Sequence, residues 1–409
     1  MAHTIKTLEA GDITRKALSI LHNNLVFCKT IDKQYDDRFA RSGAKNGGTL
    51  LIREPNQFTV RSGAIMDTQD VTESTQTLTV ATQKGVDINF SSVELTLSLD
   101  DFAERILNPA MSRLAAEVDK TVIAGCYPYV YNFTHTTFGT VPNLADLLQA
   151  RAKLSKGLAP MSDRVCMTDA LAGNGIITAG VNLFHTASEI SRQYDTGLLG
   201  TIYGFKFYET ETTPTHTNGS RTDTTPTVST TVGITSGDAT ITMSAFASST
   251  TYKAGDVFTI AGVYAVNPET KAVYQHLQQF VVTVNVTASA TSMTCEVNPT
   301  PITSGAKQNC SIKTASATAA VVNLTAGGSG AASTGYVNSL AYHKNAFTMV
   351  TADLEMPKGV DFAAREVFDG ISLRVVRQFD IVNDKFPCRI DVLFGYKTIR
   401  PEWATRICS

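Results

Sequence analysis

The pattern of hydrophobic and polar residues changes its period once within the segment 86–130. From Val86 to Phe90 apolar and polar residues alternate, which is typical of a strand with one buried face. From Asp100 the apolar residues recur about every fourth position, which predicts one apolar stripe along a helix. The stripe comprises Phe102, Ile106, Ala110, Leu114, Val118 and Val122. Because Pro109 lacks an N–H and clashes with the preceding turn, we expect a kink or a join of two helices near Asn108.

The chain before this helix predicts one amphipathic helix, a polar arm and a long hairpin. The helix covers residues 12–24, and the arm that follows reads either as a frayed terminus or as a segment that orders on a neighbour. Residues 49–60, broken by Pro55, and residues 77–81 have the composition of two strands. An isolated hairpin is marginal in water. Since this one has little apolar surface, we expect it to lie on another part of the protein or on another copy.

The chain after the long helix predicts mixed helices and strands, interrupted by a different kind of segment. Residues 142–157 have a helical pattern, and residues 164–168 (RVCMT) read as a short buried strand. Residues 371–379 and 389–398 alternate and are separated by a polar turn, so they are candidates for antiparallel strands. Residues 222–334 carry four lysines, no arginine and five acidic residues, with short β-type runs between turns. This composition predicts an all-β barrel or sandwich inserted into an α+β protein.

Composition and charge exclude several classes of function. The formal net charge is −2, so bulk charge does not indicate a nucleic-acid binder. Charged residues make up 18% of the 409 positions, below the usual ~25%, which is compatible with extensive burial against other subunits. No segment has the length and hydrophobicity of a membrane span or a signal peptide. The seven scattered cysteines, without a C-x-x-C, indicate free thiols in a reducing compartment.

Motifs for catalysis or metal binding are weak. There is no H-E-x-x-H, and the seven histidines form no close pair. The sequence around Ser329 approaches G-x-S-x-G but lacks the last glycine and a following helix pattern, so a hinge is favoured over a nucleophile. Gly173-Asn174-Gly175 is too short for a phosphate loop. We therefore expect no catalytic, cofactor or metal site.

The charged residues of the long hairpin are the candidate contact residues between subunits. One interpretation is a solvated surface, and the other is charge complementary to the next subunit, which would set register more than affinity. The candidates are Arg53, Glu54, Arg61, Asp67, Asp70 and Glu73.

The tail of the chain resembles the C-terminal part of the P22-type bacteriophage coat proteins. The resemblance is strongest from Leu340 to Pro401 and rests on runs such as AREVFDGISLRVVRQFD and RIDVLFGYKTIRPE. The order of parts is also similar to the HK97 capsid fold with a P22-like insertion domain. The resemblance therefore implies an α+β, HK97-like fold with an inserted all-β barrel-like domain.

The resemblance also implies a division of the chain and a set of partners. Its parts would be an N-terminal arm (1–45), an extended loop (46–85), a peripheral-domain strand with the spine helix (86–130), the first part of the axial domain (131–220), the inserted all-β domain (221–334) and the axial and peripheral return strands (335–409). The implied function is a major capsid protein that self-assembles into an icosahedral shell around the double-stranded DNA of a tailed bacteriophage. Implied partners are many copies of itself in hexamers and pentamers, a scaffolding protein, a portal, a decoration protein and DNA held by confinement, with no membrane. The implied location is the virion, after assembly in the bacterial host cytoplasm.

Two other functions remain open from the residues alone. The threonine-rich β-module is also compatible with a phage tail or adhesin protein that binds a surface glycan, which predicts trimers and glycan binding by residues 222–334. An enzyme using Ser329 would react with an active-site serine probe.

Overall fold

The computed structural model describes residues 10–36, 49–66, 68–70, 73–91, 106–134, 141–180, 200–220, 226–228, 234–289, 291–312, 320–323 and 335–408. The chain forms two compact units. The first comprises residues 1–53, 75–123 and 347–397, and the second comprises residues 54–74, 124–346 and 398–409. Each unit is thus assembled from segments that are distant in the sequence.

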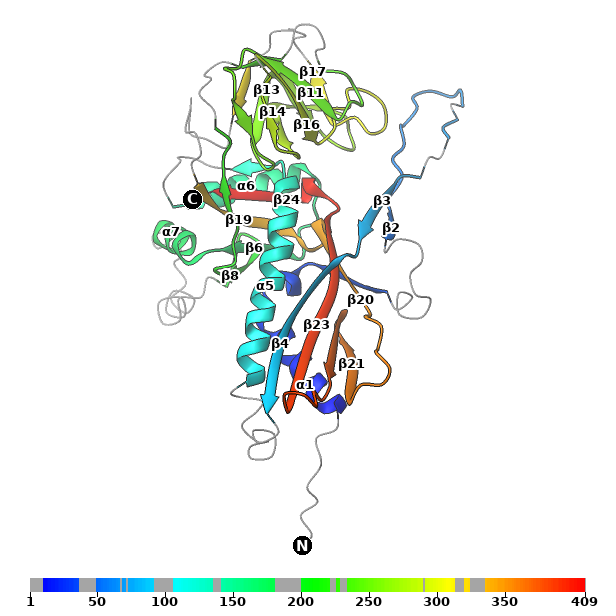
Figure 1. Cartoon of the computed structure of the whole chain (residues 1–409). Helices are drawn as coiled ribbons and strands as arrows, with labels where there is room; N and C mark the ends of the chain where they lie inside the picture. The colour runs from blue at the N-terminus through cyan, green and yellow to red at the C-terminus, as the bar shows by residue number, and fades with distance from the viewer. Residues whose placement is uncertain are drawn as a thin grey trace, which may run out of the picture. The chain divides into compact units, whose positions relative to one another are not determined.

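The first unit contains a six-stranded sheet in the order β1-β20-β23-β22-β21, with β4 also paired to β23 (Figure 1). Its strands are β1 (Asp32–Asp36), β4 (Thr82–Ser91), β20 (Phe347–Ala352), β21 (Phe362–Phe368), β22 (Ile371–Arg377) and β23 (Lys385–Thr398). β22 and β23 are antiparallel, with Arg374 opposite Asp391, so the strand pair predicted from alternation in the tail is confirmed. β4 is antiparallel to β23 and alternates between half-buried and exposed residues, as its sequence predicted.

The N-terminal arm contributes a strand to this sheet. β1 pairs in parallel with β20, with Asp32 opposite Thr348. Neither interpretation of the arm, frayed end or segment ordered on a neighbour, holds for residues 32–36, because their backbone pairs with the chain's own sheet. Residues 37–45 of the predicted arm lie outside the described residues.

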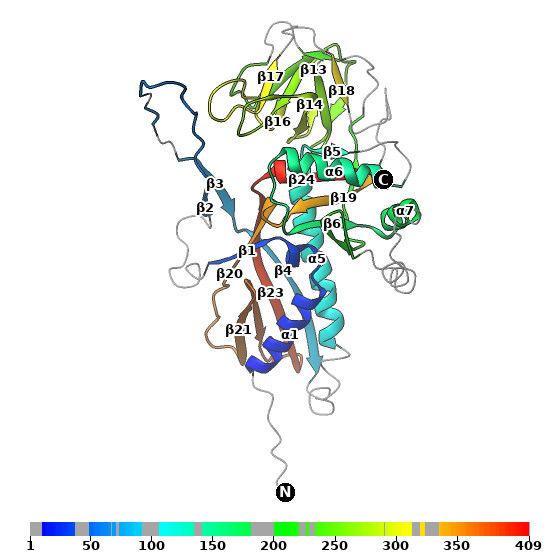
Figure 2. The same cartoon turned by 180° about the vertical axis from the view of Figure 1, so that it is seen from behind.

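Helix α1 (Ala10–Asn24) packs on β21 and β22 (Figure 2). His22 Nε2 lies 2.8 Å from a carboxylate oxygen of Asp369, and Lys33 from β1 donates to the same oxygen. Asp369 has a φ of 48° in the Asp369-Gly370 turn between β21 and β22. The side chains of His22 and Lys33 thus attach this turn to the N-terminal segment.

The long helix α5 (Asn108–Cys126) carries the predicted apolar stripe, in which Leu114, Val118 and Val122 are buried. The regular helix begins at Asn108, directly after π-helical residues at 106–107, so Pro109 lies in its first turn. An N–H there has no intrahelical partner to lose, which makes proline favourable at this position. The part of the predicted helix before Ile106 lies outside the described residues. A 3-10 turn, η2 (Tyr127–Tyr129), follows α5.

The second unit contains a seven-stranded sheet in the order β5-β24-β19-β6-β8-β7, with β9 paired to β19. Its strands are β5 (Phe133–Thr134), β6 (Arg164–Thr168), β7 (Thr201–Ile202), β8 (Phe205–Glu209), β9 (Thr215–Thr217), β19 (Gly335–His343) and β24 (Ala404–Cys408). All five residues of β6 are buried, which confirms the buried strand predicted at RVCMT. The strands of this axial sheet come from both sides of the low-charge segment.

Two helices accompany the axial sheet, α6 (Leu144–Lys156) and α7 (Ala170–Gly180). Asn143 caps α6 by accepting from the N–H of Ala145 and Asp146, while Asp146 accepts from the N–H of Asn143. This reciprocal capping box explains why the helix begins there. Two short 3-10 turns, η3 (Lys344–Ala346) and η4 (Pro401–Trp403), complete the unit's helical elements.

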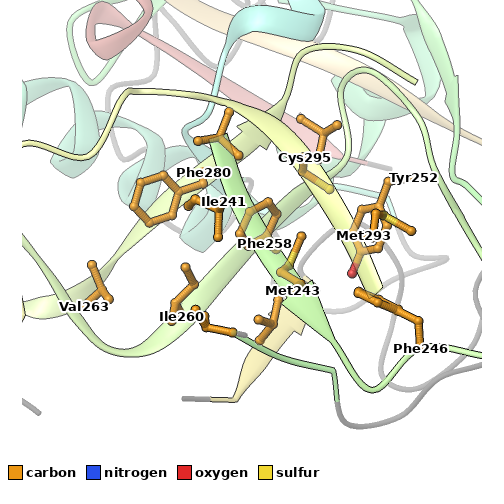
Figure 3. Close-up of a cluster of buried hydrophobic side chains, with 14 of the residues drawn as sticks. Ile241, Met243, Phe246, Tyr252, Phe258, Ile260, Val263, Phe280, Met293 and Cys295 are labelled. Atoms are coloured by element: carbon orange, nitrogen blue, oxygen red, sulfur yellow. The ribbon is translucent and has the colours of Figure 1, made fainter. Parts of the chain in front are cut away.

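The low-charge segment forms an all-β domain within the second unit, as predicted. Its strands are β10 (Thr227–Val228), β11 (Thr240–Ser244), β12 (Thr251–Tyr252), β13 (Val257–Val266), β14 (Val273–Val282), β15 (Val286–Thr287), β16 (Ser292–Asn298), β17 (Cys310–Ile312) and β18 (Val321–Asn323). Figure 3 shows its core, where aromatic and aliphatic side chains from facing strands pack together. Phe258 and Phe280 stack with ring centroids 5.9 Å apart. The predicted fold class, α+β with an inserted all-β domain, is confirmed.

Candidate assembly surfaces

A long hairpin, formed by β2 (Thr49–Arg53) and β3 (Thr75–Thr79), leaves the first unit from a packed root. The strands are antiparallel, with Leu50 opposite Leu78. One face of the root packs on the six-stranded sheet, where its apolar residues form a cluster with Val350, Ala352 and Leu393. Gly395 on β23 allows this contact, because a Cβ there would lie 2.3 Å from the carbonyl oxygen of Thr79. The root therefore lies on the chain's own sheet.

Beyond Arg53 the two sides of the hairpin are held by side chains more than by a backbone ladder. The N–H of Glu54 donates to the carbonyl of Ser74 at 2.9 Å. Farther out, the side chain of Gln69 accepts from the N–H of Thr59 at 2.8 Å and donates to its carbonyl at 2.6 Å. These contacts give the hairpin a defined path without an apolar core.

The hairpin tip exposes large apolar side chains. Val60 is 97% exposed and Ile65 is 88% exposed, and Phe58 and Met66 are also mostly exposed. Burying one such side chain contributes about 1.5–3 kcal/mol, so leaving several in water on one tip is costly. Clusters of this kind mark interaction sites on soluble proteins. The tip is therefore the leading candidate for a contact with another molecule.

Five of the six charged residues predicted as contacts are described, and they lie along the hairpin from the end of β2 to the start of β3. Arg53, Arg61, Asp70 and Glu73 are exposed and Glu54 is half-buried, whereas Asp67 lies outside the described residues. Arg61 donates to the carbonyl of Gly63 in its own loop. The hairpin was expected to have little apolar surface, whereas its tip carries this exposed apolar cluster. Its signal was present in the short runs FTV and AIM.

A second exposed apolar surface lies at the turn between β22 and β23. Ile381 and Val382 are each 84% exposed. Asp380 orders the turn, because its carboxylate accepts from the N–H of Val382 at 3.0 Å and from the side-chain amide of Asn383 at 2.8 Å. These interactions lower the pKa of Asp380. The sequence predicted a polar turn here and missed its apolar tip.

A buried polar cluster joins the β-domain to the axial sheet. Asp256 lies 2.8 Å from Nε2 of His216, and the hydroxyl of Tyr127 lies 3.2 Å from Nδ1 of the same ring. Arg406 donates to the carbonyl of Gly255 at 2.8 Å, and burial lowers its pKa. The His216 and Asp256 side chains are 3% and 0% exposed, and both ring nitrogens are engaged, so no face is left for a substrate. The cluster acts as a structural junction.

A second junction lies between α6 and β14. The ammonium of Lys153 donates to the carbonyl of Phe133 and to the side chain of Gln279. Burial, with a smaller contribution from Lys156, lowers the pKa of Lys153 to about 7. Burial and the charges of the same lysines lower the pKa of His276 to about 4. Both shifts disfavour the protonated forms, so this junction carries less positive charge at neutral pH than the same side chains would in water.

Within the described part of the chain, no group of three His, Cys, Asp or Glu residues is placed to hold a metal ion. Among the same residues, no helix is both long and apolar enough to cross a membrane. The sequence around Ser329 lies outside the described residues. Gly173 to Gly175 are part of helix α7.

Residues 207–406 match the family model described as "P22 coat protein - gene protein 5". The matched segment begins in the axial sheet, contains the whole β-domain and ends in β24. This segment, just under half of the chain, is similar to the P22 coat proteins. The match supports a role as the major capsid protein of a tailed bacteriophage, in the virion and assembled with copies of itself.

Solved structures similar to this chain include phage capsid proteins. A chain from Mycobacterium phage Che8 is 11% identical with a TM-score of 0.45, covering 94% of this chain and 90% of that one. The capsid structure of Cyanophage P-SCSP1u is 10% identical with a TM-score of 0.45, covering 94% and 87%. The mature capsid of bacteriophage PhiM1 is 10% identical with a TM-score of 0.44, covering 94% and 86%. No curated protein sequence matches this chain.

Proposed function

We propose that copies of this chain close into an icosahedral shell of hexamers and pentamers, in which each hairpin tip is buried by a neighbouring copy. The observation that carries this proposal is the combination of a rigid root and an exposed apolar tip. The root is fixed by packing around Leu78, whereas Val60 and Ile65 are left almost fully exposed by the described part of the chain. A second copy of the chain supplies their apolar partner.

The division of the chain proposed for this role is the one that the sequence suggested. Residues 1–45 act as the arm, 46–85 as the extended loop, 86–130 as the strand and spine helix, 131–220 and 335–409 as the axial and return parts, and 221–334 as the insertion domain. Arg53, Glu54, Arg61, Asp67, Asp70 and Glu73 then surround the apolar contact and set its register through charge. In protein interfaces complementary charges set the register of the partners, whereas burial of apolar surface supplies most of the affinity.

The shell acts without catalysis and holds double-stranded DNA by confinement. A net charge of −2 on each subunit gives no bulk attraction for phosphates and little repulsion between copies. Individual contacts near the standard size of about 1,600 Å² suffice, because each subunit makes several. Assembly takes place in the host cytoplasm on a scaffolding protein, with a portal and a decoration protein as further partners.

The test is electron microscopy of the protein produced with and without its scaffolding partner. The proposal predicts uniform closed shells with five-fold and six-fold clusters of subunits. Small soluble oligomers under both conditions would contradict it.

A further inference from the structure

The loop between β16 and β17, residues 299–309, is fastened on several sides and is named here the insertion loop. The side chain of Asn309 accepts from the N–H of Ile302 at 2.9 Å and donates to the carbonyl of Thr300 at 2.7 Å. The ammonium of Lys271 donates to the carbonyls of Ala306 and Gln308. A loop whose polar groups are satisfied in this way holds one shape, so a side chain on it has a defined position.

Lys307 on the insertion loop contacts the neck of the hairpin, the name used here for Glu54 and Ser74 just beyond β2 and β3. Its ammonium donates to the hydroxyl of Ser74 at 3.2 Å, and that hydroxyl donates to the carboxylate of Glu54 at 2.8 Å. The N–H of Glu54 also donates to the carbonyl of Ser74 at 2.9 Å. One lysine of the β-domain therefore acts on both sides of the neck at once, where the regular pairing of β2 with β3 ends.

The neck has a second neighbour in the same unit. The pKa of Glu402 in η4 is raised, mainly because its carboxyl group is buried and to a smaller extent because of the negative charge of Glu54. Arg400 acts in the opposite direction on Glu402. Glu54 thus lies near both a cation of the insertion loop, reached through Ser74, and the carboxyl group of Glu402.

We propose that Lys307, acting through Ser74 and Glu54, is a positioning residue that fixes the direction of the hairpin tip relative to the β-domain before another copy binds. Lys307 and Ser74 do not need to touch the neighbouring copy. The contacts are exposed or half-buried and therefore weak, so the brace directs the tip while leaving it free to adjust. Ordering the tip in advance removes part of the entropy cost of docking. This last consequence rests on the proposed function, whereas the brace itself does not.

The direct test is a distance distribution between spin labels on the unassembled protein. Labels are attached at S62C on the hairpin tip and S292C on the outer face of β16, in a chain carrying C388S to remove a half-buried native thiol. The proposal predicts a narrow distribution for the otherwise native chain. K307A should lower the ratio of braced to unbraced chains about fivefold, as expected for loss of one surface charge contact. K307R keeps a donor and should restore the narrow distribution.

K253A is the matched control, because Lys253 is another lysine of the β-domain and no hydrogen bond or ion pair joins it to the described residues of the hairpin neck. It should leave the distribution unchanged. Equal widths for the native chain and K307A, with the β-domain still folded by its thermal transition, would overturn the brace. The same variants examined for shells separate the two proposals. A broad distribution with normal shells would overturn the role in docking, whereas loss of shells from the native chain would count against the proposed function alone.

Discussion

The carboxylate of Asp119, in the middle of α5, accepts a hydrogen bond from the backbone N–H of Cys28 at 3.0 Å. It also accepts from the N–H groups of Val26 and Phe27, at 2.7 and 3.1 Å. These groups begin the short helix α2 (Phe27–Thr30), which has no cap from its own N-terminal residue. The long helix thus supplies the cap that links the N-terminal arm to the spine. Burial nevertheless raises the pKa of Asp119.

Removing this cap should destabilise the first unit. D119A leaves three N–H groups without their acceptor, and unsatisfied buried donors cost about 1–3 kcal/mol each. We expect a loss of about 3 kcal/mol or more in the free energy of unfolding, measured by urea denaturation. K120A changes an exposed neighbour on the same helix and should change stability by less than about 0.5 kcal/mol. Equal effects of the two variants would refute the capping role.

Stability should depend on pH through Lys153. Its pKa falls from the usual ~10.4 of a free lysine to about 7 in the folded chain. Lys153 therefore binds its proton less tightly in the folded chain than in the unfolded chain. Its unfavourable contribution to the free energy of folding is complete below pH 7 and disappears progressively as the pH rises toward 10. K153M should gain stability relative to the native chain at pH 6, and the gain should shrink at pH 10. Gln279 still donates to the carbonyl of Phe133 at 3.0 Å in the variant.

The measurement for Lys153 is the difference in unfolding free energy between variant and native chain at several pH values. K120M, at an exposed position, serves as the control and should give a flat difference. A flat difference for K153M as well would mean that the amine is not held in an unfavourable site.

The hairpin root should not tolerate a side chain at Gly395. In G395A the new Cβ would meet the carbonyl of Thr79 at 2.3 Å, so the hairpin must separate from β23. We expect faster hydrogen exchange at Leu78 and Val80 and fewer assembled shells, measured by exchange mass spectrometry and sedimentation. G335A is the control, since its nearest neighbours lie at 3.7 Å. Native exchange at the root in G395A would contradict the packing described.

The turn at Ile381 and Val382 should serve assembly and contribute little to folding. Both side chains are exposed, while the side chain of Asp380 and its backbone pairing with Lys385 hold the turn. The double variant I381S/V382S should keep the melting temperature and reduce the yield of shells. D380A should instead loosen the turn, and we expect it to lower both the melting temperature and the yield of shells. An unchanged yield of shells in the double variant would show that this apolar tip has no role in assembly.

The parts of the fold that the sequence predicted are those with a regular period or a sharp change in composition. β22, β23 and the buried strand β6 follow from alternation or apolar runs, and the β-domain follows from its few charges. β1 was missed because its polar residues, DKQYD, pair through the backbone with β20. A polar strand of this kind leaves no hydrophobic pattern to detect.

The position of the hairpin was predicted from the sequence, but the apolar surface at its tip was not. The hairpin was located correctly, yet its apolar tip was missed because the pair Phe58 and Val60 is separated from Ile65 and Met66 by the stretch RSGA, so the four residues show no period. The Asp119 cap and the His216–Asp256 pair join residues from distant segments. Such contacts depend on tertiary packing and cannot be predicted from the spacing of residues within one segment.

The central claim is that the hairpin tip is buried by another copy of the chain. Thiol labelling of V60C, in a chain carrying C388S, measures this directly in unassembled protein and in purified shells. The account predicts fast labelling before assembly, since Val60 is 97% exposed, and strong protection within the shell. Equally fast labelling in both states would contradict it.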